Sequence, residues 1–237
     1  MTASSEPSQA AVRLQQVQRR IHTATLRCGR DPASVALLAV SKLQPAQAIR
    51  DLYAAGQRSF GENYVQEAVG KCAELADLRD VEWHLIGPLQ SNKSRDVAET
   101  MHWVHAVNRL KIAERLSTQR PQAMPPLNVC IQVNISGEAS KSGCAPGEAI
   151  SLVQAASLLP QLRVRGLMGM PEPGIGDVAT RRQFTMLASL FAEAKRTVAG
   201  LDTLSIGMSD DLEIAVSCGS TMVRVGTALF GARPSRA

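Results

Sequence analysis

Short apolar runs alternate along the chain with segments in which apolar residues recur every three or four positions. Such runs are typical of buried strands, and the wider spacing is typical of helices with one buried face. Eight strands are predicted, at residues 35–40, 59–61, 83–86, 103–107, 128–133, 164–168, 203–206 and 222–225. Helices are predicted between them, at residues 45–55, 64–76, 91–99, 109–119, 146–159, 179–198 and 210–217.

An extra helix is predicted before the first strand. Its apolar face is formed by Leu14, Val17, Ile21 and Ala24. The glycine and proline within residues 28–32 end this pattern. Residues 1–9 are small and polar, and we expect them to be disordered.

Eight strand–helix units predict an α/β fold, a closed (β/α)8 TIM barrel, whose usual length is about 250 residues. An open doubly wound sheet is the alternative. It would normally have fewer strands and a glycine-rich phosphate loop after the first strand, and residues 41–45 (SKLQP) contain no such loop. No linker rich in proline, glycine and serine divides the chain, so residues 1–237 are predicted to form one domain.

Composition and charge narrow the possible partners. The net charge is +5, but basic residues are interspersed with acidic ones, and aromatic residues make up only 3% of the chain. Nucleic acid is therefore not an expected partner. No run of about 18 apolar residues occurs, so no membrane span is predicted. The five cysteines form no CxxC pair, which indicates reduced thiols rather than disulfides or a zinc site, and we expect a cytoplasmic protein.

Candidate chemistry collects where the predicted strands end, which is where a barrel places its active site. Lys42 follows the first apolar run. An ammonium is costly to desolvate, so an apolar setting favours the neutral, nucleophilic amine and suits it to a Schiff base with an aldehyde. The alternative is a lysine whose ammonium simply reaches solvent from the strand end.

The ends of the last two predicted strands indicate a phosphate site. Gly207, Met208 and Ser209 follow the seventh strand, and Gly226 and Thr227 follow the eighth. Barrels often bind phosphate in these two loops, where glycines let backbone N–H groups approach. An aldehyde-ready lysine opposite a phosphate cradle suggests pyridoxal phosphate, which carries both groups.

Other polar residues have structural interpretations beside functional ones. Asn63 could close a turn or cap a helix, and His84 could be a hydrogen-bonded core histidine. His102 and His105 would point to opposite faces of a strand, which disfavours a metal pair. Asp210 and Glu213 have the spacing of a capping box for the last predicted helix.

Six ordered motifs resemble those of the pyridoxal phosphate homeostasis proteins, relatives of the amino-terminal barrel of alanine racemase. They are residues 39–42 (AVSK), 61–67 (GENYVQE), 83–93 (WHLIGPLQSNK), 132–136 (QVNIS), 205–211 (SIGMSDD) and 219–227 (GSTMVRVGT). The resemblance extends over nearly the full chain. Ile206 stands where the family pattern has methionine, a conservative change.

This resemblance implies specific roles for residues of the chain. Lys42 would form the internal aldimine with pyridoxal phosphate, and Arg224 would approach the pyridine nitrogen. The phosphate would be held by Ser209, Gly226 and Thr227, and Met208 would also contact the cofactor. Asn63 and His84 would lie near the ring. Because arginine stays protonated, Arg224 would keep the ring nitrogen unprotonated, which makes the ring a poorer electron sink.

Two functions remain open within this resemblance. The first is a monomeric, non-catalytic protein that buffers pyridoxal phosphate or delivers it to apo-enzymes, with no activity beyond slow side reactions. The second is an amino-acid racemase. A racemase resembling this barrel adds a carboxyl-terminal domain that supplies a second base, whereas residues 228–237 alone follow the last motif. A Schiff-base aldolase without cofactor is a third hypothesis. We expect the first.

Overall fold

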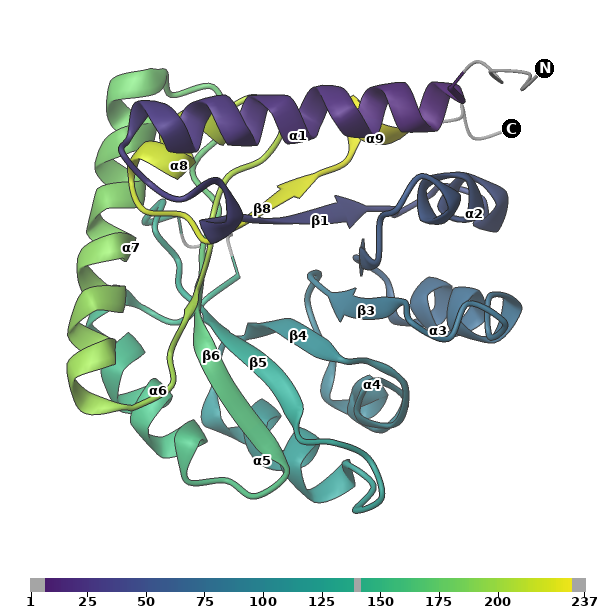
Figure 1. The fold of residues 1–237 in the computed structure, drawn as a ribbon. Coiled ribbons are helices and arrows are strands. Elements are labelled where there is room, and N and C mark those ends of the chain that lie inside the picture. The colour runs from purple at the N-terminus through teal and green to yellow at the C-terminus, as the bar shows by residue number, and fades with distance from the viewer. Residues whose placement is uncertain (1–6, 139–141, 232–237) are drawn as a thin grey trace.

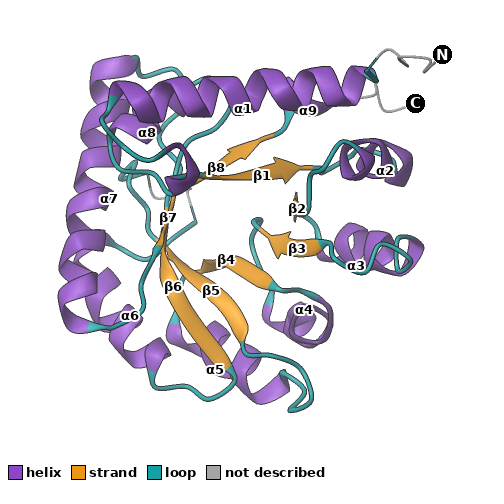
Figure 2. Ribbon diagram, in the orientation of Figure 1, coloured by secondary structure: helices purple, strands orange, loops and turns teal. Residues whose placement is uncertain are grey.

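Eight parallel strands form a closed barrel in the computed structural model, with helices around its outside (Figures 1 and 2). The structure describes residues 7–138 and 142–231. The strands are β1 Ala36–Val40, β2 Ser59–Glu62, β3 Glu82–Leu85, β4 Trp103–Val107, β5 Leu127–Gln132, β6 Leu162–Met168, β7 Thr203–Ser205 and β8 Met222–Val225. They pair in chain order, and β8 closes on β1. The predicted barrel and its eight strands are confirmed.

Most helices lie where the apolar spacing predicts them. They are α1 Gln9–Arg27, α2 Ala46–Ala54, α3 Val65–Glu74, α4 Ser94–Thr100, α5 Leu110–Gln119, α6 Ala149–Ser157, α7 Asp177–Thr197, α8 Leu212–Ser217 and α9 Thr227–Phe230. Short 3-10 turns occupy Pro32–Ser34, Ser91–Lys93 and Pro146–Glu148. The single turn α9 was not predicted, because four residues are too few to display a helical period.

The extra helix α1 covers the outside of the barrel beside α8 and α9 (Figure 1). It begins at Gln9, within the segment predicted to be disordered, because the Ser8 hydroxyl caps it by accepting the backbone N–H of Ala11. Residues 1–6 of that segment lie outside the described residues. The four apolar positions that predicted α1 are buried. Arg20 joins α1 to α8 through a bidentate salt bridge with Glu213.

That contact corrects the predicted capping box. Glu213 bonds to Arg20 of α1, and the residue at the start of α8 is Asp211, not Asp210. The Asp211 side chain does not cap its own helix. It instead accepts the backbone N–H of Met208 at 2.5 Å, which fixes the turn after β7. Asp211 therefore fixes the turn after β7, and Glu213 joins α8 to α1.

The barrel holds two kinds of buried environment. Aliphatic residues such as Leu85 and Val104 join the large apolar core, whereas Trp103, Cys130 and Met168 form a separate small cluster. Polar side chains are buried as well, among them His84, His105, Ser205 and Arg224. A buried polar group is costly unless it is hydrogen-bonded. These four residues therefore form bonds with one another.

No helix among the described residues has both the length and the apolar character needed to cross a membrane. The described residues likewise contain no cluster of three or more metal-ligating side chains.

Candidate functional site

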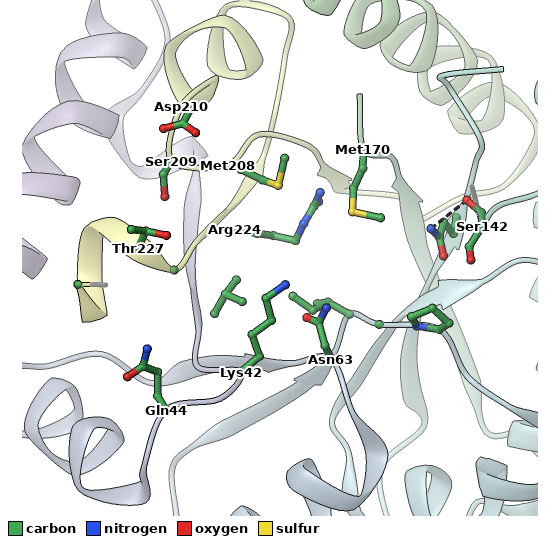
Figure 3. Close-up of a pocket in the computed structure, with 17 residues that line it drawn as sticks. Lys42, Gln44, Asn63, Ser142, Met170, Met208, Ser209, Asp210, Arg224 and Thr227 are labelled. Atoms are coloured by element: carbon green, nitrogen blue, oxygen red, sulfur yellow. Dashed lines mark hydrogen bonds between the residues drawn. The ribbon is translucent and has the colours of Figure 1, made fainter. Parts of the chain in front are cut away.

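A cavity of about 460 Å³ opens where the strands of the barrel end (Figure 3). Seven of the eight predicted site residues line it: Lys42, Asn63, Met208, Ser209, Arg224, Gly226 and Thr227. Its remaining walls include Gln44, Ile86, Gly87, Pro88, Gln132, Ser142, Met170 and Asp210. This volume lies in the range of about 300–1,000 Å³ that is typical of small-molecule sites. The strand-end positions that the barrel predicts therefore do meet in one place.

Lys42 lies two residues beyond Val40, the last residue of β1, and is half-buried. Its side chain extends across the cavity toward Arg224, with Asn63 beside it (Figure 3). The residue that precedes it, Ser41, is completely buried, and the residue that follows, Leu43, is exposed. The lysine thus stands at the boundary between the barrel core and the cavity.

A network of charged side chains from β2 and α3 holds the backbone on both sides of Lys42. Lys71 of α3 donates from Nζ to the carbonyl oxygen of Ser41 at 2.7 Å, to Glu62 Oε1 at 2.8 Å and to Glu67 Oε1 at 2.7 Å. The Ser41 hydroxyl donates to the same Glu62 oxygen at 2.5 Å. Glu67 Oε1 also accepts the backbone N–H of Leu43 at 2.6 Å. The flanking residues of Lys42 are therefore anchored to one ion-pair network.

Leu43 shows why such an anchor is needed. Its φ angle is +61°, a left-handed conformation that costs energy in a residue with a branched side chain. The Glu67 carboxylate holds its N–H in this turn. Burial raises the pKa of the Glu62 carboxyl, against the opposing effects of Lys71 and Ser41. The network thus depends on the Lys71 ammonium as its common donor.

Asn63 presents an unused acceptor to the cavity. Its Oδ1 atom is buried and has no hydrogen-bond partner among the described residues. Asn63 does not cap the following helix, since Tyr64 is the residue at the start of α3. An added Cβ on Gly87 would lie 2.1 Å from the Asn63 carbonyl oxygen, so glycine is required beside it. Because buried polar atoms are nearly always paired, Oδ1 is a candidate ligand contact.

Arg224 of β8 lies at the floor of the cavity and is almost wholly buried. Its Nη1 donates to the carbonyl oxygen of Ser205 at 2.6 Å and to Ser205 Oγ at 2.8 Å, and its Nη2 donates to the Gly169 carbonyl at 3.0 Å. Burial lowers the pKa of this guanidinium to about 10, against the raising effect of Asp211. Arg224 therefore remains a cation at neutral pH.

The two loops predicted to hold phosphate meet on one side of the cavity. Ser209 and Thr227 lie close together there, across from Asn63 (Figure 3). Gly207 turns the chain after β7 with φ +97°, and an added Cβ would lie 2.5 Å from Ala215 Cβ, so only glycine fits. At the start of α9, the first N–H groups have no partner within the helix. The two hydroxyls therefore lie on the same side of the cavity as the start of α9.

His84 is the predicted site residue that the structure does not bring to the cavity. Its side chain is completely buried, stacked on Trp103 with ring centroids 5.2 Å apart, and its Nδ1 lies 3.0 Å from His105 Nε2. The residues of this part of the chain that line the cavity, Ile86, Gly87 and Pro88, follow the end of β3, whereas the His84 ring is buried against Trp103 and His105. His84 is thus the hydrogen-bonded core histidine of the structural interpretation.

Several lining residues were missed by sequence reasoning. Gln44 follows a strand end, so the rule that places chemistry there could have found it. Asp210 was assigned only a capping role, although it lines the cavity. Gln132 lies inside β5, and nothing in its apolar neighbourhood distinguishes it from a core position.

Comparison with known proteins places the chain among relatives of similar length. The family model described as alanine racemase, N-terminal domain, matches residues 12–234. A pyridoxal phosphate homeostasis protein of Pseudomonas aeruginosa is 58% identical over 226 residues, which is 95% of this chain and 96% of that protein.

Solved structures show the same barrel. PipY of Synechococcus elongatus, solved with pyridoxal phosphate bound, is 40% identical with a TM-score of 0.82, over 94% of this chain and all of that one. Alanine racemase from Streptomyces coelicolor has a TM-score of 0.72 at 24% identity, over 94% of this chain and 59% of that one. The second likeness concerns the fold alone.

Proposed function

Because the chain belongs to the pyridoxal phosphate homeostasis proteins, a family built on the alanine racemase N-terminal domain, we propose that it binds pyridoxal phosphate and takes part in its intracellular homeostasis. In this proposal it holds the cofactor as a Schiff base on Lys42 and buffers or delivers it. The observation that carries the proposal is the cavity itself, which brings one lysine amine, one buried guanidinium and two donor-rich loops within reach of a single small molecule.

The donor set fits this cofactor. When bound, pyridoxal phosphate supplies an aldehyde that a lysine amine takes up with loss of one water. Lys42 is the amine that lines the cavity in the described part of the chain. The buried Oδ1 of Asn63 has no hydrogen-bond partner within residues 7–138 and 142–231 and can accept from a bound ligand. The family position of Lys42 in residues 39–42 supports the same assignment.

Each end of the cavity suits a different part of the cofactor. We assign the phosphate to the Ser209 hydroxyl, the Thr227 hydroxyl and backbone N–H groups of the same two loops, since charge-assisted bonds to phosphate are short and strong. The N–H of Met208 is not among them, because it donates to Asp211. We assign the ring nitrogen to Arg224. A guanidinium only donates hydrogen bonds, so it would stabilise the unprotonated ring nitrogen. His84 has no direct place in this assignment.

We propose that the protein is not an amino-acid racemase. Racemisation needs a proton acceptor on one face of the substrate and a donor on the other. The titratable side chains that line the described cavity are Lys42, Asp210 and Arg224, and Asp210 lies on the side that we assign to phosphate. A cationic guanidinium at the ring nitrogen also disfavours the electron-sink form of the ring. These features favour a carrier over the racemase alternative.

The wider setting is part of the same proposal. We propose that the protein works in the cytoplasm as a monomer and that apo forms of pyridoxal phosphate-dependent enzymes receive the cofactor. The five cysteines are free thiols, which supports a reducing compartment. Neither nucleic acid nor a membrane is needed as a partner.

An absorption spectrum tests the proposal. The purified protein mixed with pyridoxal phosphate should gain a visible band that free cofactor lacks, and Lys42→Ala should lose that band. Lys93→Ala, outside the cavity lining, is the matched control and should keep it. A band that survives in Lys42→Ala would contradict the assignment, and no band in the unaltered protein would favour a cofactor-free function.

A further inference from the structure

A chain of buried polar side chains runs through the barrel from the floor of the cavity to the opposite end of the strands. Arg224 Nη1 donates to Ser205 Oγ at 2.8 Å. Ser205 Oγ lies 3.0 Å from His105 Nδ1, and His105 Nε2 lies 3.0 Å from His84 Nδ1. His84 Nε2 then faces Glu82 Oε2 at 3.8 Å. Four strands contribute to it, namely β3, β4, β7 and β8.

The two ends of this chain favour one direction for the hydrogen bonds within it. Glu82 at 3.8 Å acts on His84 through its charge, since His84 Nε2 has no hydrogen-bond partner among the described residues. A guanidinium can only donate and a carboxylate can only accept. If the Ser205 hydroxyl accepts from Arg224 and donates to His105 Nδ1, then His105 carries its proton on Nε2 and donates to His84 Nδ1. His84 then carries its proton on Nε2, directed at Glu82. The reverse direction would aim the lone pair of His84 Nε2 at a carboxylate.

The surroundings favour neutral imidazoles in this arrangement. His84, His105 and Ser205 are completely buried. Burial lowers the pKa of both histidines, with the charge of Arg224 adding to the effect at His105 and Glu82 opposing it at His84. The His84 ring, together with Trp103 and Ser59, lowers the pKa of Glu82 to about 2, so its carboxylate is present at neutral pH.

The hydrogen bonds of Arg224 to other residues use only part of its guanidinium N–H groups. Among the described residues, its contacts to Ser205 and Gly169 take three of the five guanidinium N–H groups. The other two, on Nε and Nη2, remain for a ligand. Ser205 receives two of the three bonds, so its position sets the orientation of the guanidinium plane.

We propose that Ser205, His105 and His84 are positioning residues that hold Arg224 in the orientation that donates to the ring nitrogen of the cofactor, through one directed hydrogen-bond chain that ends at His84, which faces the Glu82 carboxylate. This inference rests on the proposed function, because Arg224 matters here through its contact with that ring. His84 thereby gains an indirect role in the site.

The direction of the chain can be tested without cofactor. The protein has four histidines, which makes assignment of their ring nitrogens by NMR practical. At neutral pH, His84 and His105 should both be neutral, with the proton on Nε2 and Nδ1 unprotonated. Ser205→Ala should abolish the fixed tautomer of His105. A proton on His105 Nδ1, or a protonated imidazolium at either residue, would overturn the inference.

The effect on the ligand can be tested with two forms of the cofactor, pyridoxal phosphate and an analogue with carbon in place of the ring nitrogen. Ser205→Ala should weaken binding of pyridoxal phosphate about tenfold and leave binding of the analogue nearly unchanged, because only the first accepts from Arg224. Ser205→Thr keeps a hydroxyl and should restore most of the loss. Ser220→Ala, which removes a buried hydroxyl bonded to the Ile206 carbonyl, is the control.

The outcomes separate this inference from the proposed function. Ser205→Ala could lower the affinities for both ligands equally, or lower neither, while borohydride still fixes the cofactor on Lys42. The positioning role would then be wrong, and the proposed cofactor binding would be unaffected. If the unaltered protein binds neither ligand, the proposed function itself fails. If Ser205→Ala does not fold, its histidine NMR signals lose the dispersion of the folded protein. His105→Gln is then used in its place, and the ratio of its affinities for the two ligands is measured in the same way.

Discussion

The Nζ atom of Lys71 lies 2.7 Å from the carbonyl oxygen of Ser41, the residue immediately before Lys42. Two lysines thus meet at the end of β1 with different tasks. Lys71 is buried and donates to three protein oxygens, whereas Lys42 lines the cavity. The first amine fixes the backbone from which the second reaches the ligand.

Lys71→Met should therefore be strongly destabilising. It leaves the buried Glu62 without its cation, and breaking a buried ion pair typically costs about 3–5 kcal/mol. Urea unfolding followed by circular dichroism measures the loss. Arg95→Met, in an exposed pair with Glu99, is the control and should change little. Equal effects of the two substitutions would show that the Lys71 network does not anchor the strand end.

A more selective test of that network uses Glu67→Gln. The substitution keeps the shape of the side chain but weakens the acceptor that holds the strained Leu43 turn. We expect the rate of covalent cofactor attachment at Lys42 to fall while overall stability falls by only about 1–2 kcal/mol, because the two bonds that Glu67 Oε1 accepts, from Leu43 and Lys71, are weakened rather than removed. Stopped-flow absorbance gives the rate. An unchanged rate in a folded variant would mean that Lys42 does not depend on this anchor.

Much of this site could be predicted from the sequence because barrel geometry is so regular. Lys42, Ser209 and Thr227 each come after a strand that the hydrophobic pattern predicts, and parallel strands bring their ends to one face. The link between Lys71 and Ser41 could not be predicted, since a lysine on a helix face is ordinarily solvated. Nor could the bonded pair His84 and His105, because the contact between the neighbouring strands β3 and β4 depends on a register that no local pattern encodes.

The phosphate cradle predicts a selective loss. Ser209→Ala combined with Thr227→Ala should weaken pyridoxal phosphate binding a hundredfold or more, since each charge-assisted bond contributes about 1.5–3 kcal/mol. Unphosphorylated pyridoxal should bind the double variant nearly as it binds the unaltered protein. Titration calorimetry with both ligands measures this difference. Equal losses for the two ligands would place the phosphate elsewhere.

The buried histidines predict how stability depends on pH. Burial lowers the pKa of His84 and of His105 in the folded state, while the unfolded chain titrates near 6.5. Below that value the unfolded state binds protons that the folded state excludes. The free energy of unfolding is therefore unaffected by the titration of these two histidines above about pH 7 and decreases as the pH falls below it. Each histidine should add a slope of up to about 1.4 kcal/mol per pH unit.

Urea unfolding between pH 7.5 and about 5.5 measures this slope, above the range in which most carboxylates titrate. His105→Gln should lower stability at every pH and reduce the slope by the contribution of one proton. A slope that stays the same in this variant would indicate that His105 is protonated in the folded protein.

A carrier should not turn over amino acids. Loaded with pyridoxal phosphate, the protein should fail to racemise L-alanine or D-alanine at an enzymatic rate, because a single lysine is the base that we assign at the ring and Arg224 disfavours carbanion stabilisation. Chiral chromatography after incubation with each enantiomer is the assay. Turnover of about 1–1,000 per second that is lost in Lys42→Ala would establish the racemase instead.

The central claim, that Lys42 carries the cofactor, is tested most directly by borohydride reduction of the loaded protein followed by peptide mass spectrometry. Reduction converts a Schiff base into a stable bond, so the modified lysine can be read from its peptide. The account predicts the reduced cofactor on Lys42, and none after reduction of Lys42→Ala. Cofactor found on Lys71 or Lys93, or on no lysine at all, would contradict it.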